Sequence, residues 1–272
     1  MPADALALAL AAAFLHAGWN VFLGGSQDVE ARTAVVLGLS VVLFAPVAAA
    51  TWSVSWAVVP YVAASAALET VYFALLVVAY RRRELSVVYP IARGSAPVLV
   101  LLGTAVVLGH EVSAAAAVGV CLVAVGVVLV RGIRSGTEGV LVALAIGCAI
   151  AGYTLVDKEG LQHAASLPYL ELVLLPVALV AVPFVVAHRG AHALRTQLTA
   201  STVVAAVASF GAYALVLAAL RLAPAPEVAA VRETSVVLAA VFAGAFLRER
   251  VGAGRLSGAV AVAAGVALIA LS

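Results

Sequence analysis

The hydrophobic pattern of this chain consists of long apolar runs separated by short polar breaks. About 20 helical residues are enough to cross the hydrocarbon core of a bilayer. Ten runs have that length: 4–24, 31–50, 56–80, 85–109, 112–131, 138–157, 167–187, 198–221, 225–247 and 252–271. Because lipid offers no hydrogen bonds to a peptide group, each run is predicted to be a helix. The pattern therefore predicts an all-α integral membrane protein with ten transmembrane helices.

The composition leaves lipid as the solvent for most of the chain. Of 272 residues, 65% are hydrophobic and 10% are charged, whereas a soluble domain carries about a quarter charged residues. The mean hydropathy is +1.20, and none of the polar breaks is long enough to form a soluble domain. The formal net charge of +2 gives no indication of a nucleic-acid partner.

Two stretches of the sequence match each other at a constant offset. Residues 93–129 and 232–268 are identical at 12 of 37 positions without a gap. Apolar identities prove little in a chain so rich in Ala, Val and Leu. The matched arginines, Arg93 and Arg232, and the matched glycines make a duplication credible. The glycine pairs are Gly119 with Gly258 and Gly126 with Gly265.

The duplication divides the ten predicted helices into five and five. We assign residues 1–134 to the first five-helix repeat and 135–272 to the second, within one integrated transmembrane domain. An odd number of helices per repeat makes the second half enter the membrane from the opposite side, so the two repeats are inverted. Inverted repeats around a central site are typical of secondary transporters.

Lys and Arg residues are distributed unevenly over the predicted loops. The loops after the odd-numbered helices hold eleven of them, and the other loops hold two. By the positive-inside rule, both termini of this multi-pass protein would then lie on the outer side of the cell membrane.

A short polar element joins the last two helices of each repeat. The two copies are GHEVSAAAAVG at 109–119 and RERVGAGRLSG at 248–258. With ten helices in inverted repeats, these elements resemble the glycine-glutamate-arginine turn of the EamA branch of the drug/metabolite transporter superfamily. The second copy has the family's spacing, and the first is one residue short. The resemblance covers essentially the whole chain and implies cytoplasmic termini, opposite to the orientation that the loop charges favour.

Arg93 and Arg232 lie inside apolar runs, where a charge is costly and therefore points to a function. At 1.5 Å per residue both lie roughly 12–13 Å deep, approaching the membrane centre from opposite sides. A guanidinium binds a carboxylate or a phosphate through two parallel hydrogen bonds. The functional interpretation is therefore a pair of anion-binding groups, and the alternative is a structural ion pair, for example with Glu69.

The superfamily also contains organophosphate and nucleotide-sugar carriers, which place basic residues on helices four and nine and a tyrosine on helix eight. By that resemblance, Arg93, Arg232 and Tyr213 are the matching positions. The helix-nine pattern departs from those carriers, because Arg232 is followed by Glu233 and not by a second base. This departure favours a zwitterion or a monoanion over a doubly charged phosphate.

Glu69 is an acidic residue in the middle of the third predicted helix. It lies on one helical face with Tyr72, three residues further on. A carboxyl group inside a span can gain and lose a proton as access alternates, or it can recognise an amine. The alternative is a buried salt bridge to Arg93 or Arg232.

The first predicted helix carries three polar or aromatic residues on one face. His16, Trp19 and Asn20 are spaced i, i+3 and i+4. Histidine titrates near physiological pH, and an indole face can hold an organic cation. The alternative is a backbone hydrogen bond for His16 and packing of Trp19 at a helix interface. The HAGWN string resembles a subgroup of these transporters with a His-x-x-Trp-Asn signature, some of them linked with phosphonate use.

Two tyrosines are further candidates for a cavity wall. AGYT at 151–154 aligns with AGWN at 17–20, so Tyr153 takes the place of Trp19 in the second repeat. Tyr89 lies one turn before Arg93 and can share its face.

Other sequence features bear on helix ends and bends. Asp157, with Lys158 and Glu159, ends the sixth predicted helix and is expected to be a solvated cap. Pro90 and Pro97 bracket Arg93, and each removes a helical hydrogen bond, so a kink could serve as a hinge or gate. The paired glycines allow close helix packing. They make helices five and ten a scaffold and leave one, three, four, six, eight and nine for the cavity.

The sequence predicts a secondary active transporter that works by alternating access and carries a small anionic or zwitterionic metabolite. The substrate-binding candidates are Arg93, Arg232, Glu69, Tyr72, Trp19, Asn20, Tyr89, Tyr153 and Tyr213. The proton-coupling candidates are Glu69, His16 and Glu233. No G-x-x-x-x-G-K-[ST] string occurs, so a proton gradient is the expected energy source.

We expect no catalytic residue, cofactor or metal, and a monomer or homodimer in the lipid bilayer. Three other classes remain open: a lipid-linked sugar flippase of the same superfamily, a membrane-embedded enzyme, and a sensor or scaffold.

Overall fold

The regular structure of this protein is helical throughout the described part of the chain. The computed structural model describes residues 1–24, 28–82, 85–131, 139–247 and 253–272. Within these ranges, the only strand-like pairing is one isolated bridge between Val54 and Ala164. The α-helices are α1 (Ala3–Gly24), α2 (Val29–Ala50), α3 (Val59–Arg82), α4 (Leu85–Leu102), α5 (Ala114–Arg131), α6 (Val140–Gly160), α7 (Ser166–Arg189), α8 (Ala191–Thr196), α9 (Ala200–Leu222), α10 (Ala225–Arg232), α11 (Thr234–Leu247) and α12 (Ala253–Leu271).

Helices occupy every apolar run that the hydrophobic pattern predicts, with three departures. The run 225–247 is divided into α10 and α11, which meet at Glu233. The run 85–109 ends in a π-helical segment, Gly103–Val107. The short helix α8 lies in a stretch that was expected to be a loop. Helix positions were thus predictable from hydrophobicity, but helix interruptions were not.

Many of these helices suit a membrane by length and composition. In the residues that the structure describes, six are long and apolar enough to cross one: Val29–Ala50, Trp56–Ala79, Val88–Val107, Val140–Gly160, Ser166–Arg189 and Ala200–Leu222. Large apolar side chains also cover the outside of the bundle. Trp56, Leu141 and Val107 are 91%, 82% and 79% exposed, which fits contact with lipid and would be unfavourable in water.

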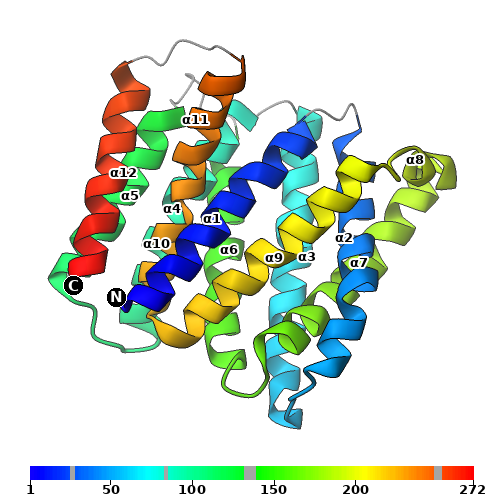
Figure 1. Cartoon of the computed structure of the whole chain (residues 1–272), viewed down its shortest axis with the longest axis horizontal. Coiled ribbons are helices and arrows are strands. Elements are labelled where there is room, and N and C mark those ends of the chain that lie inside the picture. The colour runs from blue at the N-terminus through cyan, green and yellow to red at the C-terminus, as the bar shows by residue number, and fades with distance from the viewer. Residues whose placement is uncertain (25–27, 83–84, 132–138, 248–252) are drawn as a thin grey trace.

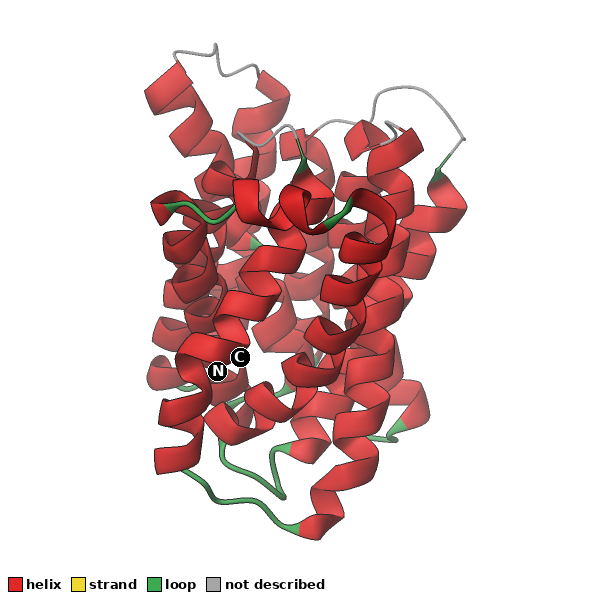
Figure 2. Cartoon of the chain, turned by 90° about the vertical axis from the view of Figure 1, so that its right-hand side faces the viewer, coloured by secondary structure: helices red, strands yellow, loops and turns green. Residues whose placement is uncertain are grey.

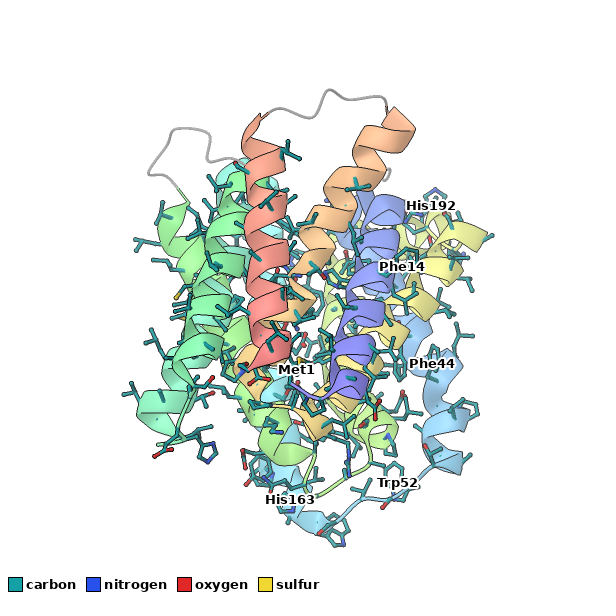
Figure 3. The ribbon with its side chains drawn as sticks, turned by 60° about the vertical axis from the view of Figure 1, so that its left-hand side comes forward. Met1, Phe14, Phe44, Trp52, His163 and His192 are labelled. Carbon is teal, nitrogen blue, oxygen red and sulfur yellow. The ribbon has the colours of Figure 1, made fainter. Side chains whose placement is uncertain are left out.

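The long helices run side by side between two ends of the molecule (Figures 1 and 2). The C-terminal ends of α1, α3, α5, α7 and α11 gather at the upper end in Figure 1. Both chain termini lie toward the other end, and Met1 sits between the lower ends of α1 and α12 (Figure 3). The Met1 amino group donates a hydrogen bond to the Ile269 carbonyl at 3.3 Å. The prediction that both termini share one side of the molecule is confirmed.

One arginine of the loop-charge count lies inside the helical bundle. Arg32 is in the first turn of α2 and is buried. Its Nη2 donates a hydrogen bond to the Ser201 hydroxyl of α9 at 2.6 Å. Arg32 therefore joins two helices and is a poor indicator of orientation.

The paired glycines lie where α5 and α12 pack against each other. A Cβ atom added to Gly119 would lie 2.9 Å from the Gly265 carbonyl oxygen, and one added to Gly126 would lie 2.7 Å from that of Gly258. Such distances leave room only for glycine at these positions. The prediction of close packing at these glycines is confirmed.

The polar element before α5 begins at a glycine with a left-handed backbone. Gly109 has a φ of +66°, a conformation that other residues rarely adopt. In the second copy of this element, residues 248–252 lie outside the described residues. Only the first copy can therefore be described in the structure. Pro90 and Pro97 both lie inside α4, which continues through them.

Candidate functional site

A cavity of about 130 Å³ lies at the centre of the bundle. Seven helices contribute to its wall: α1, α2, α3, α4, α6, α9 and α10. The side chains that line it are Ala12, His16, Trp19, Thr33, Glu69, Tyr72, Phe73, Leu76, Tyr89, Arg93, Tyr153, Ser209, Ala212, Tyr213, Val216 and Arg232. Helix α2, through Thr33, is an addition to the helices that the sequence assigned to the wall. The volume is below the roughly 300–1,000 Å³ of sites for drug-sized ligands, so it suits a small molecule.

The two arginines of the repeat meet at the cavity and share one acidic residue. Arg93 is the ninth residue of α4, and Arg232 is the last of α10; each is 6% exposed. Glu233 is fully buried, with one oxygen 2.8 Å from Arg93 Nε and the other 3.8 Å from Arg232 Nε. Arg93 Nη2 also donates to the Ser235 hydroxyl at 3.2 Å. The acidic partner of Arg93 is therefore Glu233, and not Glu69 as one interpretation of the sequence suggested.

The break between α10 and α11 places Glu233 between the arginines. Its backbone (φ −70°, ψ −9°) caps α10, and α11 begins at the next residue. In the described part of the chain, two nitrogens of Arg232, Nε and Nη2, are buried without a hydrogen-bond partner, whereas Arg93 has one such nitrogen, Nε, which lies 2.8 Å from Glu233. Buried unpaired donors are costly and rare. They give Arg232 the capacity to bind an oxygen-bearing anion.

The acidic side of the cavity holds two carboxyl groups. Glu69 is 4% exposed on α3 and lines the cavity with Tyr213. Behind it lies Asp157, which is 1% exposed on α6. Asp157 accepts hydrogen bonds from the hydroxyls of Ser65 at 2.6 Å, Tyr169 at 2.9 Å and Tyr213 at 2.6 Å.

The expectation that Asp157 is a solvated cap is wrong. Helix α6 continues to Gly160, so Asp157 lies inside the bundle and on the same helical face as Tyr153. Lys158 is also engaged, since its ammonium donates to the carbonyls of Leu220 and Ala223 at the end of α9. The i, i+4 spacing from Tyr153 to Asp157 was the sequence signal that could have revealed this residue.

Aromatic rings from three helices form a continuous wall. The ring centres of Tyr72 and Tyr153 are 6.3 Å apart, and those of Tyr153 and Tyr213 are 6.1 Å apart. These tyrosines come from α3, α6 and α9. Such a wall can pack the apolar body of a ligand while its hydroxyls remain available for hydrogen bonds.

The face of α1 that was predicted from spacing also reaches the cavity. The Trp19 indole N–H donates to His16 Nδ1 at 3.2 Å, and the two rings meet edge to face at 5.3 Å. The His16 ring thus bonds the Trp19 side chain within one turn of the helix. The side chain of Asn20, also predicted to take part, lies outside the described residues.

The structure brings most of the predicted residues to one place. Eight of the nine substrate-binding candidates line the cavity: Trp19, Glu69, Tyr72, Tyr89, Arg93, Tyr153, Tyr213 and Arg232. Of the proton-coupling candidates, Glu69 and His16 line it, and Glu233 lies behind the two arginines. The sequence analysis missed the polar wall residues Thr33 and Ser209.

The cavity therefore presents opposite charges to one small space. Two arginines, one carboxyl group and several aromatic rings line this space together. This arrangement can hold both ends of a zwitterion, or an anion together with a proton.

Comparison with known proteins identifies the family and the fold. Residues 137–271 match the EamA-like transporter family. No curated protein matches this chain in sequence. A solved crystal structure superposes on 100% of this chain and 98% of its own chain, with a TM-score of 0.78 and 15% sequence identity. At that identity the likeness shows a shared fold and nothing of function.

Proposed function

We propose a function for this chain from its membership of the EamA-like transporter family, which the match over residues 137–271 establishes and which the sequence resemblance predicted. The family consists of membrane transporters, and the apolar helices make this chain a multi-pass membrane protein. The function that the cavity supports best is secondary active transport of a small anionic or zwitterionic metabolite. We expect no catalytic activity.

The observation that carries the proposal is that Arg93, Arg232 and Glu69 line one cavity. Arg232 has buried N–H groups free to bind an anion, and Glu69 is positioned to receive an amine or a proton. In the proposal Trp19, Tyr72 and Tyr153 pack the body of the substrate, with Tyr89, Tyr213 and Asn20 beside them. Because Glu233 neutralises one arginine, a single carboxylate or monoanionic phosphonate fits the remaining positive charge.

We further propose that the chain crosses the membrane ten times, as inverted repeats at 1–134 and 135–272, and works by alternating access. Three observations support this arrangement. Helices fill all ten predicted runs, the termini lie together, and the family match at 137–271 coincides with the second repeat. A site between two inverted halves can open to each side in turn as the halves rock. The proposed location is the cell membrane.

Energy for the transport is proposed to come from protons. Glu69 is the first candidate for the coupling group, because it lines the cavity and is nearly inaccessible to solvent. His16 also lines the cavity. Glu233 has two arginine neighbours, which favours a fixed counter-charge over a group that exchanges a proton.

A thermal-shift screen of the purified protein tests the substrate class. Amino acids, phosphonates, amines and sugars would be compared on the wild type, on Arg93→Ala and on Arg232→Ala. We expect a carboxylate or phosphonate compound to raise the melting temperature of the wild type and of neither variant. Stabilisation by uncharged sugars alone would contradict the proposal.

Proteoliposomes loaded at one pH and diluted into another then test transport of the stabilising compound. We expect accumulation only with an imposed pH gradient and a loss of that dependence in Glu69→Gln. Unchanged accumulation in Glu69→Gln would remove Glu69 from the coupling role.

A lipid-linked substrate is the second candidate function, and one feature of the bundle bears on it. An apolar pocket of about 310 Å³ lies between α2, α3 and α7, and it shares Thr33 and Phe73 with the central cavity. Acyl chains could occupy such a groove while a headgroup reached the arginines. The cavity itself is more polar than this groove, which favours the small polar metabolite.

A bulky residue in the groove separates the two candidates. Ala181 lines the groove but not the central cavity. In Ala181→Trp, transport of a water-soluble substrate should stay within about twofold of the wild type, since a surface change away from the site costs little. Movement of a fluorescent lipid-linked sugar that stops in Ala181→Trp would support the flippase instead.

A further inference from the structure

We propose that Asp157 and Glu69 share one exchangeable proton through the hydroxyl group of Tyr213. On the proposed transport function, this pair is the site at which proton movement is coupled to the substrate. Asp157 thereby becomes a functional residue, although it does not line the central cavity.

The first step of the argument is the position of Asp157. Its carboxyl group is buried between α3, α7 and α9, and it accepts hydrogen bonds from Ser65, Tyr169 and Tyr213 on those helices. All three partners are hydroxyl groups, which both donate and accept hydrogen bonds. The site can therefore accommodate Asp157 with or without a proton, because a protonated carboxyl can donate to a hydroxyl that had donated to it.

The second step is the bridge between the two carboxyl groups. The Tyr213 hydroxyl donates to Asp157 Oδ2 at 2.6 Å, and Tyr213 lines the central cavity together with Glu69. Tyr169, by contrast, donates a hydrogen bond to Asp157 from α7 and does not line the cavity. Tyr213 is thus the connection between the buried carboxyl group and the carboxyl group that faces the substrate.

The third step is the charge of the central cluster. Two arginines face three carboxyl groups, and the closest pair joins Arg93 to Glu233 at 2.8 Å. Arg232, at 3.8 Å from Glu233, is the remaining cation, and it lines the same cavity as Glu69. With all groups ionised the cluster carries one excess negative charge. In a low-dielectric interior that excess favours the uptake of one proton, as in carboxyl pairs that share a site.

Polar and charged groups near Asp157 come from four neighbouring helices. Helix α3 contributes Ser65 and Glu69, α7 contributes Tyr169, α9 contributes Tyr213, and α10 contributes Arg232. Tyr153 is one turn away on the same helix. The single cation of this set is Arg232, so no basic residue among these neighbours holds Asp157 in a fixed ion pair.

The proton transfer conserves charge and atoms. The Asp157 carboxyl passes its proton to the Tyr213 oxygen, while the Tyr213 O–H bond breaks and its proton moves to the Glu69 carboxylate. Tyr213 returns to its original state, and one proton has moved from the buried group to the group that lines the cavity. The reverse transfer follows the same path.

The position of Asp157 along α6 also gives the proton two routes. Tyr153, one turn before it, lines the central cavity, whereas Lys158 and Glu159, directly after it, line a second cavity of about 470 Å³ near the chain termini. Asp157 itself lines neither cavity, but its neighbours along α6 line both. A carboxyl group in this position can exchange protons with one side while Glu69 exchanges with the other.

Infrared spectroscopy of the full-length protein in liposomes tests the shared proton without any substrate. The carboxylic-acid carbonyl band would be followed as the pH is raised, in the wild type, Asp157→Asn and Glu69→Gln. If one proton is shared, either substitution removes the whole band near neutral pH, because each removes the excess negative charge that held the proton. If each variant removes only its own part of the band, or if Asp157→Asn leaves the band unchanged, the proposal is overturned.

A pair of tyrosine variants decides the question even if Asp157→Asn does not fold. Tyr213→Phe and Tyr169→Phe each remove one hydroxyl from Asp157, but of the two tyrosines only Tyr213 lines the cavity with Glu69. We expect Tyr213→Phe to move the midpoint of the band's titration by about one pH unit, the equivalent of one hydrogen bond to a charged group, and Tyr169→Phe to move it by clearly less. Equal shifts in the two variants would overturn the bridging role.

Transport measurements keep this proposal distinct from the proposed function. With a stabilising compound from the thermal-shift screen, Asp157→Asn should lose accumulation driven by a pH gradient, whereas Tyr169→Phe, a change outside the central cavity, should keep it. Absence of any transport in the wild type would refute the proposed function and leave the infrared result intact. Full gradient-driven accumulation in Asp157→Asn would refute the coupling role of the pair.

Discussion

The segments around Arg93 and Arg232 occupy the same place in the two repeats but differ in structure. Around Arg93, α4 is a continuous helix with Pro90 and Pro97 inside it. The only proline inside α10 is Pro226 in its first turn, yet the helix is interrupted seven residues later, and α10 gives way to α11 at Glu233. The interruption follows the buried acidic residue, and not the residues that usually break a helix.

The residue after each arginine accounts for much of this difference. Gly94 follows Arg93 and allows α4 to pack closely on α5, since a Cβ atom there would lie 3.0 Å from Val128 Cγ2. Glu233 follows Arg232 and supplies a negative charge to both arginines. One copy of the repeat thus provides close packing and the other provides the counter-charge, so the site requires both halves.

Removal of the counter-charge should have the largest effect. In Glu233→Gln two buried arginines face each other without a full compensating charge, which should lower the free energy of unfolding by about 3–5 kcal/mol. Unfolding in detergent micelles measures it. Glu227→Gln on the same helix is the matched control, with an expected loss of less than about 1 kcal/mol because Glu227 is only partly buried. Equal losses in the two variants would contradict the role of Glu233.

The second largest loss of stability should come from a methyl group added beside Arg93, in the first repeat. Gly94→Ala places a Cβ atom 3.2 Å from the Ala124 carbonyl oxygen, and overpacking of this kind costs roughly 1–3 kcal/mol. Gly18→Ala on α1 is the control, since no atom lies within 4 Å of its added Cβ; it should be neutral or slightly stabilising. If Gly18→Ala lowered the free energy of unfolding as much as Gly94→Ala, close packing at Gly94 would not explain the loss.

Substitutions of the two arginines should differ in effect, one mainly on stability and the other mainly on substrate binding. Arg93→Gln should lower the melting temperature more than Arg232→Gln, because Arg93 makes the shorter contact with Glu233. Arg232→Gln should weaken binding of an anionic substrate more, by about 10- to 100-fold, the equivalent of one hydrogen bond between charged groups. Titration calorimetry and thermal melting on both variants measure the two effects. The opposite order in both measurements would show that the assignment is reversed.

Loss of a single hydroxyl should have the smallest effect. Ser235→Ala removes the 3.2 Å hydrogen bond from Arg93 and should destabilise the protein by about 1 kcal/mol. The corresponding residue of the other repeat is already alanine, Ala96. Thermal melting compares Ser235→Ala with the wild type, and a loss of substrate binding beyond about twofold would indicate that Ser235 contacts the ligand directly.

Helix positions were largely readable from the sequence because hydrophobicity acts locally. Any stretch of about 20 apolar residues must satisfy its own backbone in lipid, whatever surrounds it. The interruption at Glu233 was not readable, since Thr234 to Leu247 continue the same apolar run. At this break the Glu233 carboxylate contacts Arg93, which only the folded bundle brings to it, as well as its sequence neighbour Arg232.

The sequence predicted which ionisable residues line the cavity, but not which residues contact one another there. Ionisable residues inside apolar runs indicated Arg93, Arg232 and Glu69 correctly as cavity residues. Asp157 was misinterpreted because it stands beside Lys158 and Glu159, a pattern typical of a helix end in solvent. Only the length of α6 and the approach of Ser65, Tyr169 and Tyr213 show that its carboxyl group is buried.

The sequence by itself determined the solvent of this protein, the places of its helices and the residues too polar for lipid. Each of these follows from the residues of one segment and the free energy of transferring them into the membrane. Tertiary structure decided which buried charge meets which. Ser65 and Asp157 are 92 positions apart, and Arg93 and Ser235 are 142 apart. Such partners are selected by the packing of whole helices, because a buried charge is stabilised only by groups within a few ångströms of it.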